Sequence, residues 1–337
     1  MNRVSTPLFV LLSLSLKLTA LAVEPSQHVL DSILLHQRNS GGWPKNINYR
    51  ALFNTTVLLK AKTNLDSTFD NGATTEEMEI LARAYRRTAN NTYRRAVLSG
   101  LRFCLKAQYD NGGWPQRFPD TNGYHGQITF NDNAMINVMT LLGHVAENER
   151  YDFVEQSLRR QARDAVNRGI ECILKCQIRV EGRPTVWCAQ HDRTTYHPAK
   201  ARSYELPSNS GSESTGIVRF LMGIEAPSSE LIRSIEGAIH WFQTHEIKGI
   251  KLTKTPAPDS PKGWDRIVVA DPQASGIWAR FYDLNTTQPF FCSRDGVPKN
   301  HISEISYERR NGYSWYTSSA ENLLKKDYPK WKERNHR

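Results

Sequence analysis

The sequence lacks the cysteine spacings that mark a redox pair or a zinc module. Its five cysteines include no Cys-x-x-Cys pair and no zinc-finger spacing. Because their number is odd, at least one cannot pair within the chain. Cys172 and Cys176 lie one helical turn apart, which favours a buried helix face over a disulfide. The cysteines therefore point to core packing and not to a metal site.

Long apolar runs are absent beyond the N-terminus, so no later stretch could cross a bilayer. At the N-terminus, Arg3 precedes an apolar run from Leu8 to Leu16, and Ala20-Leu21-Ala22 has the small-x-small form of a cleavage site. This run is too short to span a membrane. It predicts a signal peptide over residues 1–22, and hence a secreted or periplasmic protein that contacts no membrane.

Acidic residues are outnumbered: 34 Asp and Glu stand against 44 Lys and Arg, a formal charge of +10. Loss of the signal peptide would remove only two of these cations. A basic exported protein suggests a polyanionic partner, and nucleic acid, an acidic lipid surface and an acidic polysaccharide all fit that charge. A basic surface that serves only solubility fits it equally well. No nucleic-acid-binding motif accompanies the charge, so we expect no nucleic-acid partner.

A Gly-Gly-Trp-Pro motif occurs twice, as Gly41-Gly42-Trp43-Pro44-Lys45 and as Gly112-Gly113-Trp114-Pro115-Gln116. Weaker echoes follow at Trp187 and at Gly263-Trp264. Successive tryptophans of this series lie 71 to 77 residues apart. A period of that length holds two helices and a loop, which is typical of stacked or circularly closed helical pairs.

Apolar residues recur at helical spacing between the tryptophans, for example at Met78, Leu81, Ala82 and Tyr85. The spacing predicts three helical pairs, 76–88 with 93–108, 133–147 with 155–177, and 213–224 with 228–244. Pairs with one apolar face each bury that face by packing around a common axis. Beyond about residue 262 the chain becomes loop-rich and aromatic, and we expect this segment to wrap the helices. The prediction is one catalytic domain over residues 23–337.

Short polar loops precede the first helix of each predicted pair, at 69–74, 130–133 and 206–213. Two of them carry an Asp-Asn dipeptide, Asp70-Asn71 and Asp132-Asn133. Such residues are ordinary helix caps. Their repetition also suits a hard cation such as calcium, which takes several carboxylate and carbonyl oxygens. Farther on, Asp192 is a further candidate oxygen ligand, and its neighbour His191 is a candidate ligand or acid.

Arginines recur in aromatic surroundings in the last third of the chain, at Arg266, Arg280 and Arg294, and Tyr313 follows in a Tyr-Ser-Trp-Tyr string. Aromatic faces stack on sugar rings, and a planar guanidinium pairs with a carboxylate through two hydrogen bonds. Each arginine alone could be a structural ion pair. Together they favour an acidic sugar over a neutral one.

Six strings along the chain resemble the family-ten polysaccharide lyases, which are pectate lyases built on an (α/α) toroid. The strings are STFDNGATTEEM (67–78), NGGWPQRFP (111–119), ITFNDNAM (128–135), WCAQHD (187–192), ARSYELPSNSGSES (201–214) and WARFYDLNTTQPFFCSRDG (278–296). The resemblance runs from about residue 28 to residue 332. It implies an all-α fold, an (α/α) toroid of about three helical hairpins with long loops and a loop-rich C-terminal segment.

The resemblance also implies a function: calcium-dependent β-elimination of α-1,4-polygalacturonate (pectate) to 4,5-unsaturated oligogalacturonides. We expect the protein to be a monomer. By motif position it implies Arg202 as the base and calcium as the cofactor. The residues it implies at the metal are Asp70, Asn71 and Asp132, with Asp192 nearby. Those it implies for binding substrate are Arg266, Arg280, Arg294 and Tyr313.

Two functions of other classes remain open. An (α/α) toroid also hosts glycoside hydrolases, in which Asp70 and Asp132 would act as the two catalytic carboxylates. A non-catalytic protein that binds acidic glycans would keep the arginines and aromatics, but it would not need Arg202.

Overall fold

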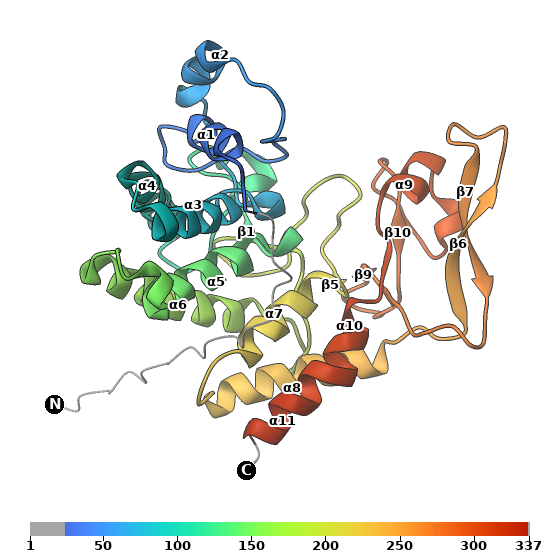
Figure 1. The fold of residues 1–337 in the computed structure, drawn as a ribbon. Coiled ribbons are helices and arrows are strands. Elements are labelled where there is room, and N and C mark those ends of the chain that lie inside the picture. Colours follow the sequence, from blue (N-terminus) through green and yellow to red (C-terminus); the bar gives the residue numbers. More distant parts are fainter. Residues whose placement is uncertain (1–23, 336–337) are drawn as a thin grey trace. The chain divides into compact units, whose positions relative to one another are not determined.

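A computed structural model describes residues 24–335 (Figure 1). The predicted signal peptide lies outside the described residues and stays a prediction. Within 24–335, no helix combines the length and the apolar character that a membrane span requires. The chain divides into two compact units, one of residues 24–173 with Gly223–Pro227 and one of Leu174–Met222 with residues 228–335. A single catalytic domain over 23–337 remains a prediction.

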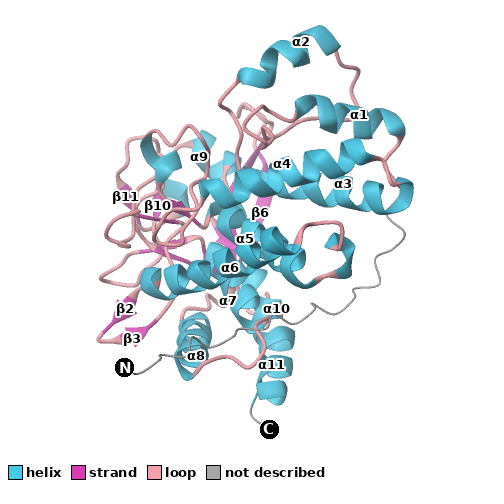
Figure 2. Ribbon diagram, turned by 90° about the vertical axis from the view of Figure 1, so that its left-hand side faces the viewer, coloured by secondary structure: helices cyan, strands magenta, loops and turns pink. Residues whose placement is uncertain are grey.

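Helices dominate the first unit (Figure 1). They are α1 (Gln27–His36), α2 (Thr55–Lys60), α3 (Thr75–Thr88), α4 (Asn91–Ala107), α5 (Ala134–Glu147) and α6 (Gln156–Cys176), whose last residues count with the second unit. Single 3-10 turns include η2 (Asp70–Gly72) and η4 (Asn131–Asn133), and one short strand is β1 (Ile128–Thr129). Helices α3 and α4 pack side by side, as Figure 2 also shows.

Each Gly-Gly-Trp loop of the first unit is tied to the helices around it by a buried indole. The Trp43 indole N–H donates to the Ile33 carbonyl and that of Trp114 to the Cys104 carbonyl, both at 2.8 Å. Gly41, with φ 102°, adopts a backbone conformation that side chains avoid, and a Cβ there would lie 2.5 Å from the Ser99 carbonyl oxygen. The loop therefore needs both its glycine and its tryptophan.

A glutamine at the end of a helix repeats the same pair of hydrogen bonds three times. The Gln37 side-chain amide donates to the carbonyls of Gly41 and Ala96 at 2.8 and 2.9 Å. Gln108 makes the equivalent pair in the first unit, and Gln177 makes it in the second. Each amide thus joins a turn to a later helix, α4 for Gln37, α6 for Gln108 and α8 for Gln177, which gives the period seen in the sequence a physical basis.

The second unit mixes helices with short strands. Its strands are β2 (Arg179–Val180), β3 (Arg183–Pro184), β4 (Gln190–His191), β5 (Asn209–Ser210), β6 (Ile250–Pro256), β7 (Trp264–Ala270), β8 (Trp278–Ala279), β9 (Phe281–Tyr282), β10 (Phe291–Cys292), β11 (Pro298–Lys299) and β12 (Tyr316–Thr317). Its helices are α7 (Glu213–Met222), α8 (Ser229–Thr244), α9 (Tyr307–Gly312), α10 (Ser319–Asn322) and α11 (Tyr328–Asn335). Antiparallel pairs join β2 to β3, β5 to β9, β6 to β7, β8 to β12 and β10 to β11.

The prediction of an all-α toroid is wrong. All six predicted helices are present as α3 to α8, but the fold combines helices and strands. The longest strands, β6 and β7, form a hairpin in register from Ile250 opposite Ala270 to Pro256 opposite Trp264. Its sequence is rich in β-branched residues, which favour strands. This hairpin has no helical spacing and was not predicted from the sequence.

The aromatic C-terminal segment is not a mere wrapping, because it builds a core of its own. Seven of its buried side chains cluster with Tyr204, and Leu252 and Val268 of the hairpin pack against them. The cluster comprises Tyr204, Phe281, Phe290, Phe291, Cys292, Ile302, Ile305 and Trp315. The expected Gly-Trp echo at Trp264 is also misplaced. It is Trp278 that is fully buried and donates its indole N–H to a helix-end carbonyl, that of Phe242 at 2.8 Å.

All five cysteines are buried free thiols, as core packing predicts. Burial raises the pKa of the Cys104 thiol to about 12, so this group stays protonated.

A buried carboxyl group lies near the start of α3. Glu77 is 6 % exposed and accepts a hydrogen bond of 2.7 Å from the Tyr49 hydroxyl, while its Oε2 has no partner among the described residues. Burial raises its pKa to about 7. The folded protein therefore holds a proton on Glu77 that the unfolded chain has already lost between pH 4.5 and 7.

Because the folded state binds more protons there, stability should fall as pH rises through that window. We expect Glu77 to remove up to roughly 3 kcal/mol of unfolding free energy between pH 5 and 8. Glu77→Gln should flatten this dependence, measured by urea denaturation at both pH values. The exposed Glu149 of the same unit provides the control, and Glu149→Gln should leave the dependence unchanged. An equal slope in all three proteins would contradict the assignment to Glu77.

Candidate functional site

Two left-handed turns of the first unit carry the predicted metal residues. In η2 the first left-handed residue is Asn71 (φ 53°), and in η4 it is Asp132 (φ 50°). A buried phenylalanine precedes each turn, and the two turns pack against each other. The structural equivalent of Asp132 is therefore Asn71 and not Asp70, so a register based on the Asp-Asn dipeptides is off by one residue.

Asp70 is a buried carboxylate with only part of its bonding capacity used. Its Oδ2 forms an ion pair with the Lys45 ammonium, whereas its buried Oδ1 has no hydrogen-bond partner within the described part of the chain. Buried polar oxygens without a partner are rare in folded proteins. The Asn71 side-chain amide donates to the Asn46 side-chain oxygen at 3.1 Å, so the Gly-Trp loop contacts both residues.

Asp132 is exposed and accepts a 2.6 Å hydrogen bond from the Asn131 side chain. Two carboxylates with neighbouring amide oxygens are ligands that a hard cation such as calcium prefers. Among residues 24–335, however, no three His, Cys, Asp or Glu side chains come together as a metal-binding group. These turns therefore fit calcium only as a partial shell, whose remaining oxygens must come from amides, water or a bound ligand.

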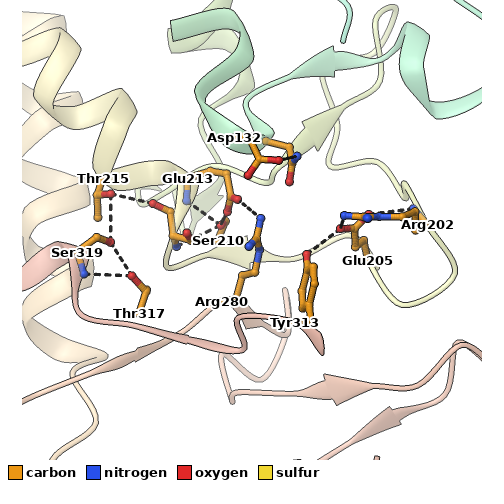
Figure 3. Close-up of polar contacts among 12 residues, drawn as sticks. Asp132, Arg202, Glu205, Ser210, Glu213, Thr215, Arg280, Tyr313, Thr317 and Ser319 are labelled. Carbon is orange, nitrogen blue, oxygen red and sulfur yellow. Dashed lines mark hydrogen bonds and ion pairs between the residues drawn. The ribbon is translucent and has the colours of Figure 1, made fainter. Parts of the chain in front are cut away.

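In the second unit, the predicted arginines gather around two tyrosines. The Arg202 guanidinium lies over the Tyr204 and Tyr313 rings at 5.1 and 5.8 Å, and that of Arg280 lies 4.8 Å from the Tyr313 ring centre. The two tyrosine rings meet edge to face at 5.3 Å. Figure 3 shows Tyr313 between the two arginine side chains. Sequence reasoning named Tyr313 but missed Tyr204.

A buried glutamate holds Arg202 in place. Glu205 accepts two hydrogen bonds from the guanidinium and one of 2.7 Å from the Tyr313 hydroxyl (Figure 3). Burial alone would raise the Glu205 pKa, but the bonds from Arg202 and Tyr313 hold it below its usual value. The same ion pair raises the pKa of Arg202. This contact favours charged Arg202 and works against its predicted role as a base.

Arg280 has a buried acidic partner of its own. Its Nη2 donates to Glu213 Oε1, and the other carboxylate oxygen accepts from the Ser210 hydroxyl. Arg280 and Glu213 are 9 % and 4 % exposed, so the pair is fixed inside the unit. Neither Glu205 nor Glu213 is among the site residues predicted from the sequence. The available signal was their place in the string 201–214, three residues after Arg202 and at the start of α7.

The remaining predicted arginines lie around the same tyrosines. Arg294 is exposed, pairs with Glu308 and lies 5.7 Å from the Tyr204 ring centre. Arg266 donates to the Tyr313 carbonyl at 2.9 Å and so supports that residue from its backbone side. The structure thus brings together all the predicted residues of the second unit except Asp192.

Asp192 closes a turn. Its Oδ1 accepts from the backbone N–H groups of Thr194 and Thr195 at 2.9 and 2.7 Å and from the Thr195 hydroxyl. Asp283 makes the same three bonds to Asn285 and Thr286 in an equivalent turn. These bonds lower the Asp192 pKa. A metal role for Asp192 stays a prediction, and the repeated turn supplies a structural role that needs no metal.

The neighbouring His191 is locked in the interior. Its Nε2 accepts from the Cys188 backbone N–H at 2.9 Å, and its Nδ1 lies 2.8 Å from the Tyr196 carbonyl. Burial lowers its pKa to about 4, so the ring is neutral at physiological pH. Both ring nitrogens are hydrogen-bonded to the backbone of this loop. In this conformation neither is available to bind a metal or to transfer a proton.

Comparison with known proteins identifies the class of this fold and site. The pectic acid lyase family model matches residues 37–324. A solved family 10 polysaccharide lyase from Cellvibrio cellulosa is 36% identical, with a TM-score of 0.80, over 91% of this chain and 92% of that chain. An alanine mutant of a family 10 lyase from the same organism, in complex with trigalacturonic acid, matches with the same identity and TM-score over 91% and 93%. Comparison with curated protein sequences gave no match.

The chain therefore belongs to the pectic acid lyase family, and it is a polysaccharide lyase. This confirms the resemblance predicted from the sequence motifs.

If Asp192 serves its turn, Asp192→Ala and Asp283→Ala should behave alike. We expect each to lower the free energy of unfolding by about 1 kcal/mol, because each removes the acceptor of two backbone N–H groups and one threonine hydroxyl in its turn. Calcium should raise the melting temperature of Asp192→Ala as much as that of the wild type. A calcium response lost only in Asp192→Ala would instead make Asp192 a ligand. Thermal unfolding with calcium and with EDTA measures both effects.

Proposed function

We propose that this lyase cleaves polygalacturonate by calcium-dependent β-elimination. The observation that carries the proposal is the group of arginines around Tyr204 and Tyr313, which suits a sugar bearing carboxylates. The trigalacturonic acid bound to the mutant of the Cellvibrio lyase supports a substrate of this class. Export, monomeric state and the 4,5-unsaturated products belong to the same proposal.

The reaction requires two kinds of group. The C5 proton of a galacturonate unit is α to a carboxylate, so its removal builds negative charge on that carboxylate. Calcium held by Asp70, Asn71 and Asp132 would supply Lewis-acid neutralisation of this charge. Arg280 and Arg294 are proposed to hold substrate carboxylates by charge-assisted hydrogen bonds. Arg280 is suited to this because Glu213 already orients it.

A base must remove the C5 proton, after which the electron pair forms the C4–C5 double bond and the C4–O4 bond breaks. We propose Arg202 for this role. Its ion pair with Glu205 opposes loss of a proton, so the role requires the bound substrate to displace Glu205 or to draw Arg202 from it. Neighbouring cations favour a neutral arginine, since like charges lower the pKa of a cation. Only neutral Arg202 can accept the C5 proton, and its share grows with pH. Activity should therefore rise towards alkaline pH.

The first test is incubation of the mature protein with polygalacturonate, with calcium or with EDTA. We expect ultraviolet absorbance of the unsaturated uronide to rise only with calcium. Asp132→Ala should slow this rise by a factor on the order of a hundred or more, because it removes a proposed ligand. Asp152 is an exposed aspartate of the same unit, and Asp152→Ala should retain activity.

The same assay separates the alternatives. Reducing ends that appear without absorbance would identify a hydrolase. Binding of polygalacturonate without cleavage at any pH would identify a glycan-binding protein. Absorbance that is equal with calcium and with EDTA would keep β-elimination and reject the metal.

Lysine variants test the base. Lysine loses its proton about two pH units below arginine. If Arg202 is the base, Arg202→Lys should shift the pH profile of kcat to lower pH and leave KM little changed. Arg280→Lys is the matched control, because both side chains lie on Tyr313. It should raise KM without moving the profile. A shifted profile in Arg280→Lys alone would transfer the base role to Arg280.

A further inference from the structure

The two copies of the Gly-Gly-Trp-Pro motif differ at the residue that follows the proline. The first copy carries Lys45 and the second carries Gln116. Lys45 places its ammonium on Asp70 Oδ2. Gln116 is buried, and its backbone carbonyl accepts from the Phe69 N–H and the Thr68 hydroxyl at 2.9 and 2.7 Å. Only the first copy therefore brings a cation to a predicted metal ligand.

Burial and the anchoring of the loop hold the Lys45–Asp70 contact in place. The Lys45 side chain is 45% exposed and that of Asp70 is 6% exposed, so a half-exposed cation caps a buried anion. The next residues repeat the pairing, since Asn46 accepts from the Asn71 amide. Trp43 anchors this loop, because its backbone N–H donates to Thr74 Oγ1 at 3.0 Å and its indole is buried.

We propose that Lys45 is the resident counter-ion of Asp70 and that a divalent cation must displace it in order to bind. A buried carboxylate needs a compensating charge, and Lys45 supplies one when no metal is present. Two cations compete for one carboxylate, so Lys45 weakens metal affinity, and the metal binds only at concentrations that displace Lys45. Within residues 24–335 the buried Oδ1 of Asp70 has no hydrogen-bond partner, so both carboxylate oxygens become available to the ion once Lys45 leaves. This inference rests on the calcium site of the proposed function.

Calcium chloride titrated into the metal-free protein by isothermal calorimetry tests the proposal. Lys45→Gln copies the residue of the second motif. It should bind calcium more tightly, on the order of tenfold, because the competing charge is gone. Lys45→Arg keeps the charge and should bind like the wild type. Lys60→Gln removes an exposed cation from α2 of the same unit, so it corrects for net charge and should leave Kd unchanged.

Thermal unfolding supplies a second readout. In EDTA, Lys45→Gln should melt below the wild type, because Asp70 has lost its counter-ion. Calcium should raise its melting temperature by more than it raises that of the wild type. An unchanged or weaker calcium affinity in Lys45→Gln would overturn the proposal, since a residue that merely positions Asp70 gives that result.

Failure of the metal site itself is distinguishable. If the wild type binds no calcium but Lys45→Gln does, the counter-ion proposal stands. If neither protein binds calcium, both this proposal and the calcium dependence of the proposed function fall. Far-ultraviolet circular dichroism checks folding, and Lys45→Met provides a second neutral side chain if Lys45→Gln does not fold.

Discussion

The hydrogen bonds of the buried tryptophans are the constraint on which the Asp-bearing turns depend. Trp43 joins the end of α1, through its indole, to the residue before α3, through its backbone. Its carbonyl accepts from the Thr68 N–H, and the Trp114 carbonyl accepts likewise from Thr129, each at 3.0 Å. Each threonine lies directly before the phenylalanine that precedes one of the two turns. The Gly-Gly-Trp loops thus position the turns that carry Asp70 and Asp132.

In the second unit, buried ion pairs position the residues of the candidate site. Glu205 and Glu213 each hold one arginine beside Tyr313, and both glutamates are buried. Arginines outnumber these glutamates around the two tyrosines, because Arg294 and Arg309 also lie near the Tyr204 ring. The result is a set of cations that is oriented before any ligand arrives. Such preorganisation lowers the cost of binding a carboxylate.

Much of the fold could be predicted from local sequence. Helices α3 to α8 follow from their apolar spacing because each buries one stripe of side chains. The hairpin of β6 and β7 was missed because several alternate positions are lysine or threonine, so the apolar alternation is weak. Arg202, Arg280 and Arg294 were predictable from motif strings. Their glutamate partners were not, since an ion pair between residues as distant as Glu213 and Arg280 leaves no local pattern.

The sequence by itself determined the family, the helical period and the residue types of the candidate site, because these are written in short strings and repeated spacings. Only the tertiary structure showed that the backbone is left-handed at both Asn71 and Asp132, which makes these two residues equivalent. It also assigned Asp192 to a turn and placed Lys45 on Asp70. These features depend on which oxygen faces which donor, and the packing of the folded chain determines those contacts.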